Sequence, residues 1–136
     1  PGFRRLMPLL LDTHIAIWAV ADPKRLSRQA VRMLDSAADG IFVSAVSIWE
    51  IAIKQSHVDL RRRLPFSADK AIEMFRAVGF LSLDIRPEHA AAVETLPMLH
   101  GDPFDRLLLA QARTEPMHLL SHDAALIAYG AGVIAV

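Results

Sequence analysis

Residues 100–112 read His-Gly-Asp-Pro-Phe-Asp-Arg-Leu-Leu-Leu-Ala-Gln-Ala. Asp102 followed by Pro103 predicts a helix start, because Asp caps the first free N–H groups and Pro at the first helical position has no N–H to lose. The apolar residues that follow continue the helix, which must end shortly before Pro116. Asp105 falls in the first turn, where the helix dipole favours a carboxylate. The stretch alone is therefore consistent with a well-capped structural helix and equally with a functional acid.

Short apolar runs alternate with segments of helical spacing along the rest of the chain. The expected strands cover residues 7–11, 41–43, 80–83, 117–120 and 133–136. The expected helices cover residues 15–21, 27–38, 44–55 (opened by Ser44 or Ser47), 67–78, 87–96, 103–114 and 123–129. Strands that alternate with helices predict a parallel sheet with helices on both faces. We therefore predict a single α/β domain with about five parallel strands.

Length and composition limit the class of protein. A chain of 136 residues is expected to form one domain, here residues 7–136, with residues 1–6 as an upstream extension ahead of Met7. The content of 53% hydrophobic and 22% charged residues excludes disorder. No apolar run reaches the roughly 18 residues that span a bilayer. Cysteine is absent, which excludes disulfides and thiolate metal sites and fits a reducing cytoplasm.

The charge balance gives little support to broad nucleic-acid binding. The formal net charge is zero, whereas phosphate contacts need Lys and Arg. RNA or DNA would have to be held by a local patch, for which Arg61, Arg62 and Arg63 are the candidates. The helpers we consider are Lys54, Arg106 and Arg113. A solvated charge run is the commoner meaning of such a triplet.

Four acids stand in apolar surroundings. Asp12 directly follows the first strand and Asp123 follows the fourth, at the strand ends where open parallel sheets bind ligands. Glu50 lies in a helix with little polar surface, where an unpaired carboxylate is costly. Each acid also has a structural explanation: a turn for Asp12, helix caps or dipole contacts for Asp105 and Asp123, and an ion pair between Glu50 and Lys54.

A single cause explains all four acids better than four coincidences. Carboxylates that converge on one cleft repel each other and raise their pKa values unless a multivalent cation neutralises them. Oxygen ligands without cysteine favour Mg²⁺ or Mn²⁺ over zinc. Such a site activates water and neutralises phosphate, so hydrolysis of a phosphodiester is the natural reaction. His14, His100 and His122 lie near these acids in sequence, but we do not assign them as ligands.

Four motifs carry a resemblance to a known family. They are Leu10-Leu-Asp-Thr-His-x-x-x-Trp18, Ser44-x-x-Ser-x-Trp-Glu-Ile-x-x-Lys54, His100-x-Asp-Pro-Phe-Asp-Arg-x-Leu-x-Ala-Gln-Ala112 and Leu120-Ser-x-Asp123. In this order, from Met7 onward, they resemble PIN-domain proteins and more narrowly the VapC toxins of type II toxin–antitoxin pairs. The resemblance implies a Mg²⁺- or Mn²⁺-dependent endoribonuclease, usually a homodimer, that a partner antitoxin keeps inactive.

The resemblance also implies roles for single residues. The acidic quartet falls on Asp12, Glu50, Asp105 and Asp123. Asp12 and Asp105 are expected to bind the metal directly, and Glu50 and Asp123 directly or through water. Thr13 and Ser121 match small hydroxyl positions near the site, and Asp102 matches the helix cap. Arg106 is expected to contact phosphate or to orient an acid. Gly101, and the absence of a Leu-Gly turn in the segment 55–63, depart from the family pattern and affect substrate contacts and loop shape.

Two other functions are compatible with the sequence, and several apolar side chains point to a binding surface. The chain could be another metal-dependent nuclease or phosphohydrolase, although Asp12-Thr13-His14 does not match the nucleophilic Asp-x-Asp of phosphatases. It could also be a catalytically silent binding module, against which the intact quartet speaks. Trp18, Phe66 and Phe75 exceed what one small core needs, so we expect a homodimer and a groove for an apolar antitoxin segment.

Overall fold

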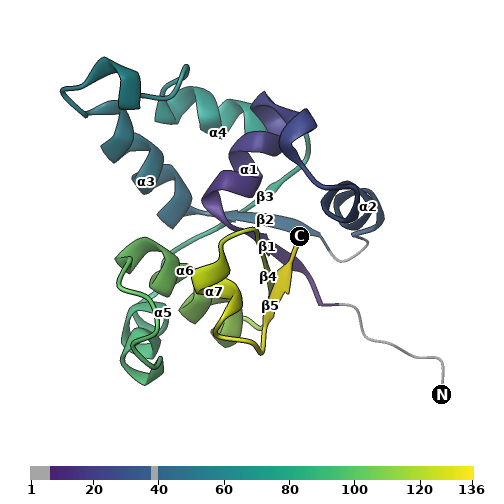
Figure 1. Cartoon of the computed structure of the whole chain (residues 1–136), viewed down its shortest axis with the longest axis vertical. Helices are drawn as coiled ribbons and strands as arrows, with labels where there is room; N and C mark the ends of the chain where they lie inside the picture. The colour runs from purple at the N-terminus through teal and green to yellow at the C-terminus, as the bar shows by residue number, and fades with distance from the viewer. Residues whose placement is uncertain (1–6, 38–39) are drawn as a thin grey trace.

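A parallel five-stranded sheet forms the middle of the molecule. The computed structural model describes residues 7–37 and 40–136 (Figure 1). The strands are β1 (Leu9–Leu11), β2 (Ile41–Ser44), β3 (Leu81–Leu83), β4 (His118–Ser121) and β5 (Val133–Ala135). Their order is β3-β2-β1-β4-β5, and each neighbouring pair is parallel. The predicted α/β fold is confirmed.

The helices follow the capping signals of the sequence. They are α1 (Thr13–Ala21), α2 (Arg28–Ser36), α3 (Ala45–Gln55), α4 (Ala68–Ala77), α5 (Pro87–Ala92), α6 (Pro103–Thr114) and α7 (Ala124–Ile127). Short 3₁₀ turns are η1 (Pro23–Arg25), η2 (Leu60–Arg62) and η3 (Val93–Thr95). Ser44, not Ser47, caps α3 by accepting a hydrogen bond from the N–H of Val46.

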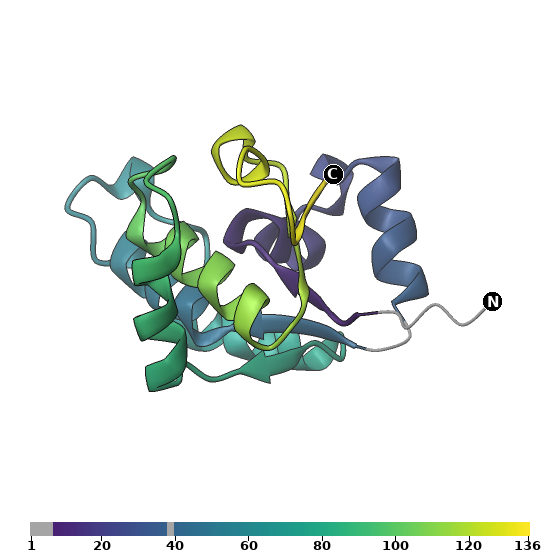
Figure 2. The ribbon, with the colours of Figure 1, turned by 90° about the horizontal axis from the view of Figure 1, so that it is seen from below.

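Side chains of the central strands alternate between two apolar cores. Leu9 and Leu11 of β1 point to one face, whereas Leu10 points to the other. The core that contains Leu9 and Leu11 also holds side chains from α1, α3 and α4, whereas the core that contains Leu10 holds side chains from α6 and α7. In Figure 1, α1, α3 and α4 accordingly lie on one side of the sheet and α5, α6 and α7 on the other. Figure 2 shows α6 running along the sheet with α5 beside it.

The ends of the expected elements shift by a few residues. Asp12 caps a helix that begins at Thr13 rather than at residue 15, and α7 ends at Ile127, two residues earlier than predicted. The expected extension at residues 1–6 and the expected helix end at residues 38–39 lie outside the described residues. The domain bounds 7–136 therefore stay a prediction. Within the described part of the chain, no helix has the length and apolar character needed to cross a membrane.

Candidate active site

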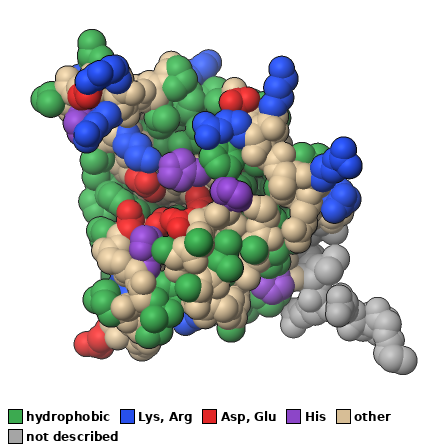
Figure 3. Space-filling model, viewed as in Figure 1, with side chains coloured by type: hydrophobic (Ala, Val, Ile, Leu, Met, Phe, Trp, Pro, Cys, Tyr) green, Lys and Arg blue, Asp and Glu red, His purple; other side chains and the backbone are tan. Residues whose placement is uncertain are grey.

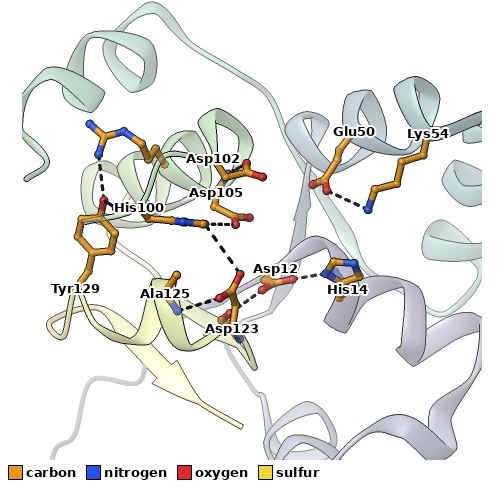
Figure 4. A network of polar contacts seen from close by, with 12 residues as sticks. Asp12, His14, Glu50, Lys54, His100, Asp102, Asp105, Asp123, Ala125 and Tyr129 are labelled. Carbon is orange, nitrogen blue, oxygen red and sulfur yellow. Dashed lines mark hydrogen bonds and ion pairs between the residues drawn. The ribbon is translucent and has the colours of Figure 1, made fainter. Parts of the chain in front are cut away.

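The four predicted acids come from separate elements and meet at the carboxyl end of the sheet. Asp12 lies between β1 and α1, Glu50 on α3, Asp105 in the first turn of α6, and Asp123 at the start of α7. Figure 4 shows their side chains facing a common space. We refer to these four acids as the acidic patch. Figure 3, in the view of Figure 1, shows acidic side chains grouped on this face of the molecule with histidines and basic side chains around them.

Asp12 is the most firmly held of the acids. It is 4% exposed, and its two oxygens accept hydrogen bonds from the backbone N–H of His14 at 2.8 Å and from Ser121 Oγ at 2.6 Å. The pKa of Asp12 is raised above its ordinary value, mainly by burial and in smaller part by the charge of Glu50. The two hydrogen bonds and the nearby His14 lower the pKa but do not offset the burial. Ser121 thus lies against Asp12, and its membership of an active site stays a prediction. Thr13 instead hydrogen-bonds Ser47 at 2.8 Å and ties α1 to α3.

Asp105 lies deep in the acidic patch beside a histidine that the sequence analysis left unassigned. Burial raises its pKa to about 6, against a hydrogen bond with His100 that lowers it. The charges of Asp102, Asp12 and Glu50 raise the pKa further. His100 Nε2 lies 2.8 Å from Asp105 Oδ2. The signal that could have identified His100 is its place five residues before Asp105, in the loop that leads into α6.

The ion pair of Glu50 with Lys54 satisfies only one of the two carboxylate oxygens. Lys54 Nζ lies 3.2 Å from Glu50 Oε2, as the structural explanation expected. Glu50 Oε1 is buried and has no hydrogen-bond partner among the described residues. A buried carboxylate oxygen without a partner costs free energy. The ion pair therefore does not account for the position of this acid.

Asp123 combines a structural and a site-facing oxygen. Its Oδ1 accepts from the N–H of Ala125 at 2.9 Å and caps α7. Its Oδ2 lies 4.0 Å from His100 Nε2. The ligand atoms of His100, Asp105 and Asp123 all lie within 4.8 Å of one another, so these residues are able to hold a metal ion.

Arg106 makes its hydrogen bonds within the fold, and its expected role in orienting an acid stays a prediction. Its guanidinium is buried and donates to the backbone carbonyls of Val93, Leu96 and Pro97 and to the hydroxyl of Tyr129. These contacts tie α6 to η3 and to the loop that follows it. Because its N–H groups serve these oxygens, Arg106 acts in the fold and not on a phosphate.

Arg61 and Arg62 lie in η2, between α3 and α4, and Arg63 follows directly after it. All three side chains are exposed. Arg61 pairs with Asp59 at 3.2 Å, and Arg63 donates to the carbonyl of His57 at 2.8 Å. A role of Arg61, Arg62 and Arg63 in binding substrate stays a prediction.

A groove of about 670 Å³ leads away from Asp12 and Asp123. Its walls include Trp18, whose ring centroid lies 6.0 Å from that of His14 and 6.1 Å from that of His122. The Arg25 guanidinium lies 4.7 Å from the centre of the Trp18 ring. Phe66 also lines the groove, whereas Phe75 is 4% exposed and belongs to the core. The expectation that Phe75 is a surplus surface residue is therefore wrong.

The raised pKa of Asp105 predicts how stability changes with pH in the absence of metal. Folded Asp105 stays protonated up to about pH 6, whereas 3.8 is its ordinary value. Between these values the folded chain holds more protons, so this group makes the free energy of unfolding fall as pH rises. Asp105→Asn should remove that loss. In EDTA, we expect the variant to exceed wild type by on the order of 1–2 kcal/mol at pH 7 and by much less at pH 4. Denaturant unfolding checks this, and an advantage independent of pH would contradict it.

A parallel sheet with clustered acids at its carboxyl edge is the architecture of a PIN domain, and the PIN-domain family model matches residues 9–132. The chain belongs to the PIN-domain family. Within it, the chain is 35% identical over 118 residues to Ribonuclease VapC22 of Mycobacterium tuberculosis (strain ATCC 25618 / H37Rv), covering 85% of this chain and 86% of that protein. This similarity places it with the VapC proteins.

Solved structures share the fold at low sequence identity. VapBC2 from Rickettsia felis, bound to a fragment of its promoter DNA, aligns with a TM-score of 0.67 and 14% identity, covering 96% of this chain and 98% of that chain. DNA-bound VapBC from Salmonella typhimurium aligns with a TM-score of 0.66 and 13% identity, covering 96% of this chain and 98% of that chain. VapC20 of Mycobacterium tuberculosis, a toxin that cleaves the sarcin-ricin loop, aligns with a TM-score of 0.57 and 15% identity. The alignment covers 90% of this chain and 95% of that chain.

Proposed function

We propose that the chain is an endoribonuclease, the toxin of a toxin–antitoxin pair, which hydrolyses RNA phosphodiester bonds at the acidic patch with Mg²⁺ or Mn²⁺. The observation that carries this proposal is Glu50 Oε1, which is buried near three other carboxylates and has no hydrogen-bond partner in the described part of the chain. A cation supplies the positive charge that this oxygen lacks. The ribonuclease name of the 35% identical relative supports RNA as the substrate.

The residues present fit a divalent cation held by oxygen ligands. Asp12, Asp105 and Asp123 would hold the ion, with Glu50 joining directly or through water. When bound, such an ion neutralises phosphate charge and makes water a better nucleophile. Ser121 and the His14 N–H fix the Asp12 carboxylate in one orientation, so this ligand is in place before substrate arrives. Lys54 holds Glu50 and brings a positive charge to the edge of the patch.

The partner we propose is an antitoxin protein. The structural neighbours include toxin–antitoxin complexes, which supports this choice. An apolar antitoxin segment that ends in a basic side chain would suit the groove beside Asp12 and Asp123, because one end of that groove is acidic and its walls are largely apolar.

A homodimer and a cytoplasmic location complete the proposal. Large apolar side chains are exposed on α3 and on the loop before α6: Trp49, Ile53, Met98 and Leu99. Trp49 also packs edge-on against Phe104 of α6 at 4.8 Å, so this apolar surface joins the two helices that carry Glu50 and Asp105. A second copy of the chain would bury such a surface. RNA as substrate and the absence of cysteine fit the cytoplasm.

Removal of divalent cations tests the proposed reaction. We expect purified, antitoxin-free protein to cleave RNA in Mg²⁺ or Mn²⁺ and to lose at least 100-fold of that rate in excess EDTA, because the four carboxylates otherwise repel a phosphate. Gel analysis of total cellular RNA measures the cleavage, and re-added Mn²⁺ should restore it. Cleavage at an unchanged rate in EDTA would reject the metal mechanism, and cleavage of DNA but not RNA would reject the substrate.

A further inference from the structure

His100 presents a ring nitrogen to two of the site's carboxylates. Its Nε2 lies 2.8 Å from Asp105 Oδ2 and 4.0 Å from Asp123 Oδ2, so it stands between α6 and α7 (Figure 4). The side chain is 21% exposed, which leaves it within reach of ions from solvent. A nitrogen at hydrogen-bonding distance from one acid and near a second is either a hydrogen-bond donor to them or a ligand beside them.

The loop that carries His100 is held in place by Tyr129. The Tyr129 hydroxyl accepts from the His100 backbone N–H at 3.1 Å and from Arg106 at 3.0 Å, and it donates to the carbonyl of Pro97 at 2.9 Å. The buried guanidinium of Arg106 fixes the same loop through further carbonyls. A loop anchored in this way presents the imidazole in one position, which is what a metal ligand requires.

The arrangement around His100 is short of positive charge. Asp12, Asp102, Asp105, Asp123 and Glu50 are gathered here (Figure 4). Glu50 Oε1 is buried and has no hydrogen-bond partner among the described residues. One imidazole cannot neutralise so many carboxylates. A multivalent cation that binds both nitrogen and oxygen would do so.

We infer that His100 Nε2 is a ligand of the divalent cation, together with Asp105 and Asp123, and that it makes this site prefer Mn²⁺ to Mg²⁺. The inference rests on the proposed metal-dependent function and names a ligand beyond the acidic quartet. Mg²⁺ is held by oxygen ligands, whereas transition-metal ions accept imidazole nitrogen readily. On binding, Nε2 gives up any proton it carries to solvent and the neutral ring keeps its proton on Nδ1.

The other two histidines near the site provide a control. His14 and His122 both lie against Trp18 in the groove. His122 Nδ1 is 2.9 Å from the carbonyl of Val136, at the end of the chain. His122 is adjacent to Asp123 in sequence but is engaged elsewhere. His122→Gln therefore removes a neighbouring imidazole without removing the nitrogen that faces the acids.

Pulsed electron paramagnetic resonance of bound Mn²⁺ tests the inference without RNA. Mn²⁺ added to metal-free wild type should show coupling to a directly bound ¹⁴N nucleus. The coupling should persist in His122→Gln and vanish in His100→Gln. Wild-type protein that binds Mn²⁺ without this coupling, or a coupling that survives in His100→Gln, would overturn the inference. Thermal unfolding in EDTA checks that each variant is folded.

Calorimetric titration adds a second readout. We expect His100→Gln to bind Mn²⁺ about 10-fold or more weakly than wild type and Mg²⁺ with a change below about 3-fold. If His100→Gln lost affinity for Mn²⁺ and Mg²⁺ equally, His100 would only orient Asp105 and would not bind the ion, which would overturn the inference. Failure of the proposed function would look different: wild type with nitrogen-coupled Mn²⁺ that leaves RNA intact supports the ligand and rejects the ribonuclease. A wild type that binds no Mn²⁺ rejects both.

Discussion

Arg106→Met is expected to lower the free energy of unfolding by about 3 kcal/mol. Methionine keeps much of the apolar stem but removes every N–H donor. The carbonyls of Leu96 and Pro97 and the hydroxyl of Tyr129 then lose a buried partner. The Pro97 carbonyl keeps the N–H of Leu99 and the Tyr129 hydroxyl as donors, so the loss falls mainly on the carbonyl of Leu96 and on the Tyr129 hydroxyl. Denaturant unfolding measures the loss.

Arg113→Met on the same helix is the matched control. Arg113 is exposed, and its guanidinium contacts the carbonyls of Tyr129 and Ala131 at 3.4 and 3.3 Å. Water replaces such contacts easily, so we expect a loss below about 1 kcal/mol. An Arg106→Met protein as stable as wild type that no longer cleaves RNA would instead support the phosphate-contacting or acid-orienting role that the family resemblance implies for Arg106.

The fold was predictable because its local signals agree with one another. Ser27, Ser67 and Asp102 each cap the helix that the sequence places after them, and the apolar runs of β1 and β4 are buried on both faces. The positions of Asp12 and Asp123 follow from the same logic, since carboxyl ends of parallel strands share one edge. Their meeting with Asp105 adds only one further step, the packing of α6 on the sheet.

The errors concern where side chains point across elements. Arg106 lies one residue after a site acid, yet one residue turns it by about 100° around the helix, toward η3 rather than the patch. His100 and Asp105 meet because the loop before α6 folds back, which no periodicity indicates. In the sequence Phe75 cannot be told apart from Phe66, which lines the groove, because both are apolar aromatic residues. The packing of α4 on α1 and α3 buries Phe75. Packing between elements decided the cases of Arg106 and Phe75, and the shape of one loop decided that of His100.

The second large effect separates the two capping aspartates at the edge of the site. Asp102 and Asp123 each cap a helix, accepting from the N–H of Asp105 at 3.0 Å and of Ala125 at 2.9 Å. Asn caps a helix about as well as Asp, so Asp102→Asn and Asp123→Asn should both fold. In EDTA each should melt at or above the wild-type temperature, since each removes one of several crowded negative charges.

Cleavage of RNA should separate the two variants. Asp123 caps α7 with Oδ1 and keeps Oδ2 for the site, 4.0 Å from His100 Nε2, so its amide keeps the cap and loses the charge that would hold a cation. We expect Asp123→Asn to lose at least about 100-fold of the cleavage rate at limiting Mg²⁺. Asp102→Asn should stay within about 3-fold, because Asp102 is assigned only the cap of α6, which the amide oxygen keeps. An inactive Asp102→Asn beside an active Asp123→Asn would show that Asp102, and not Asp123, is the fourth acid of the site.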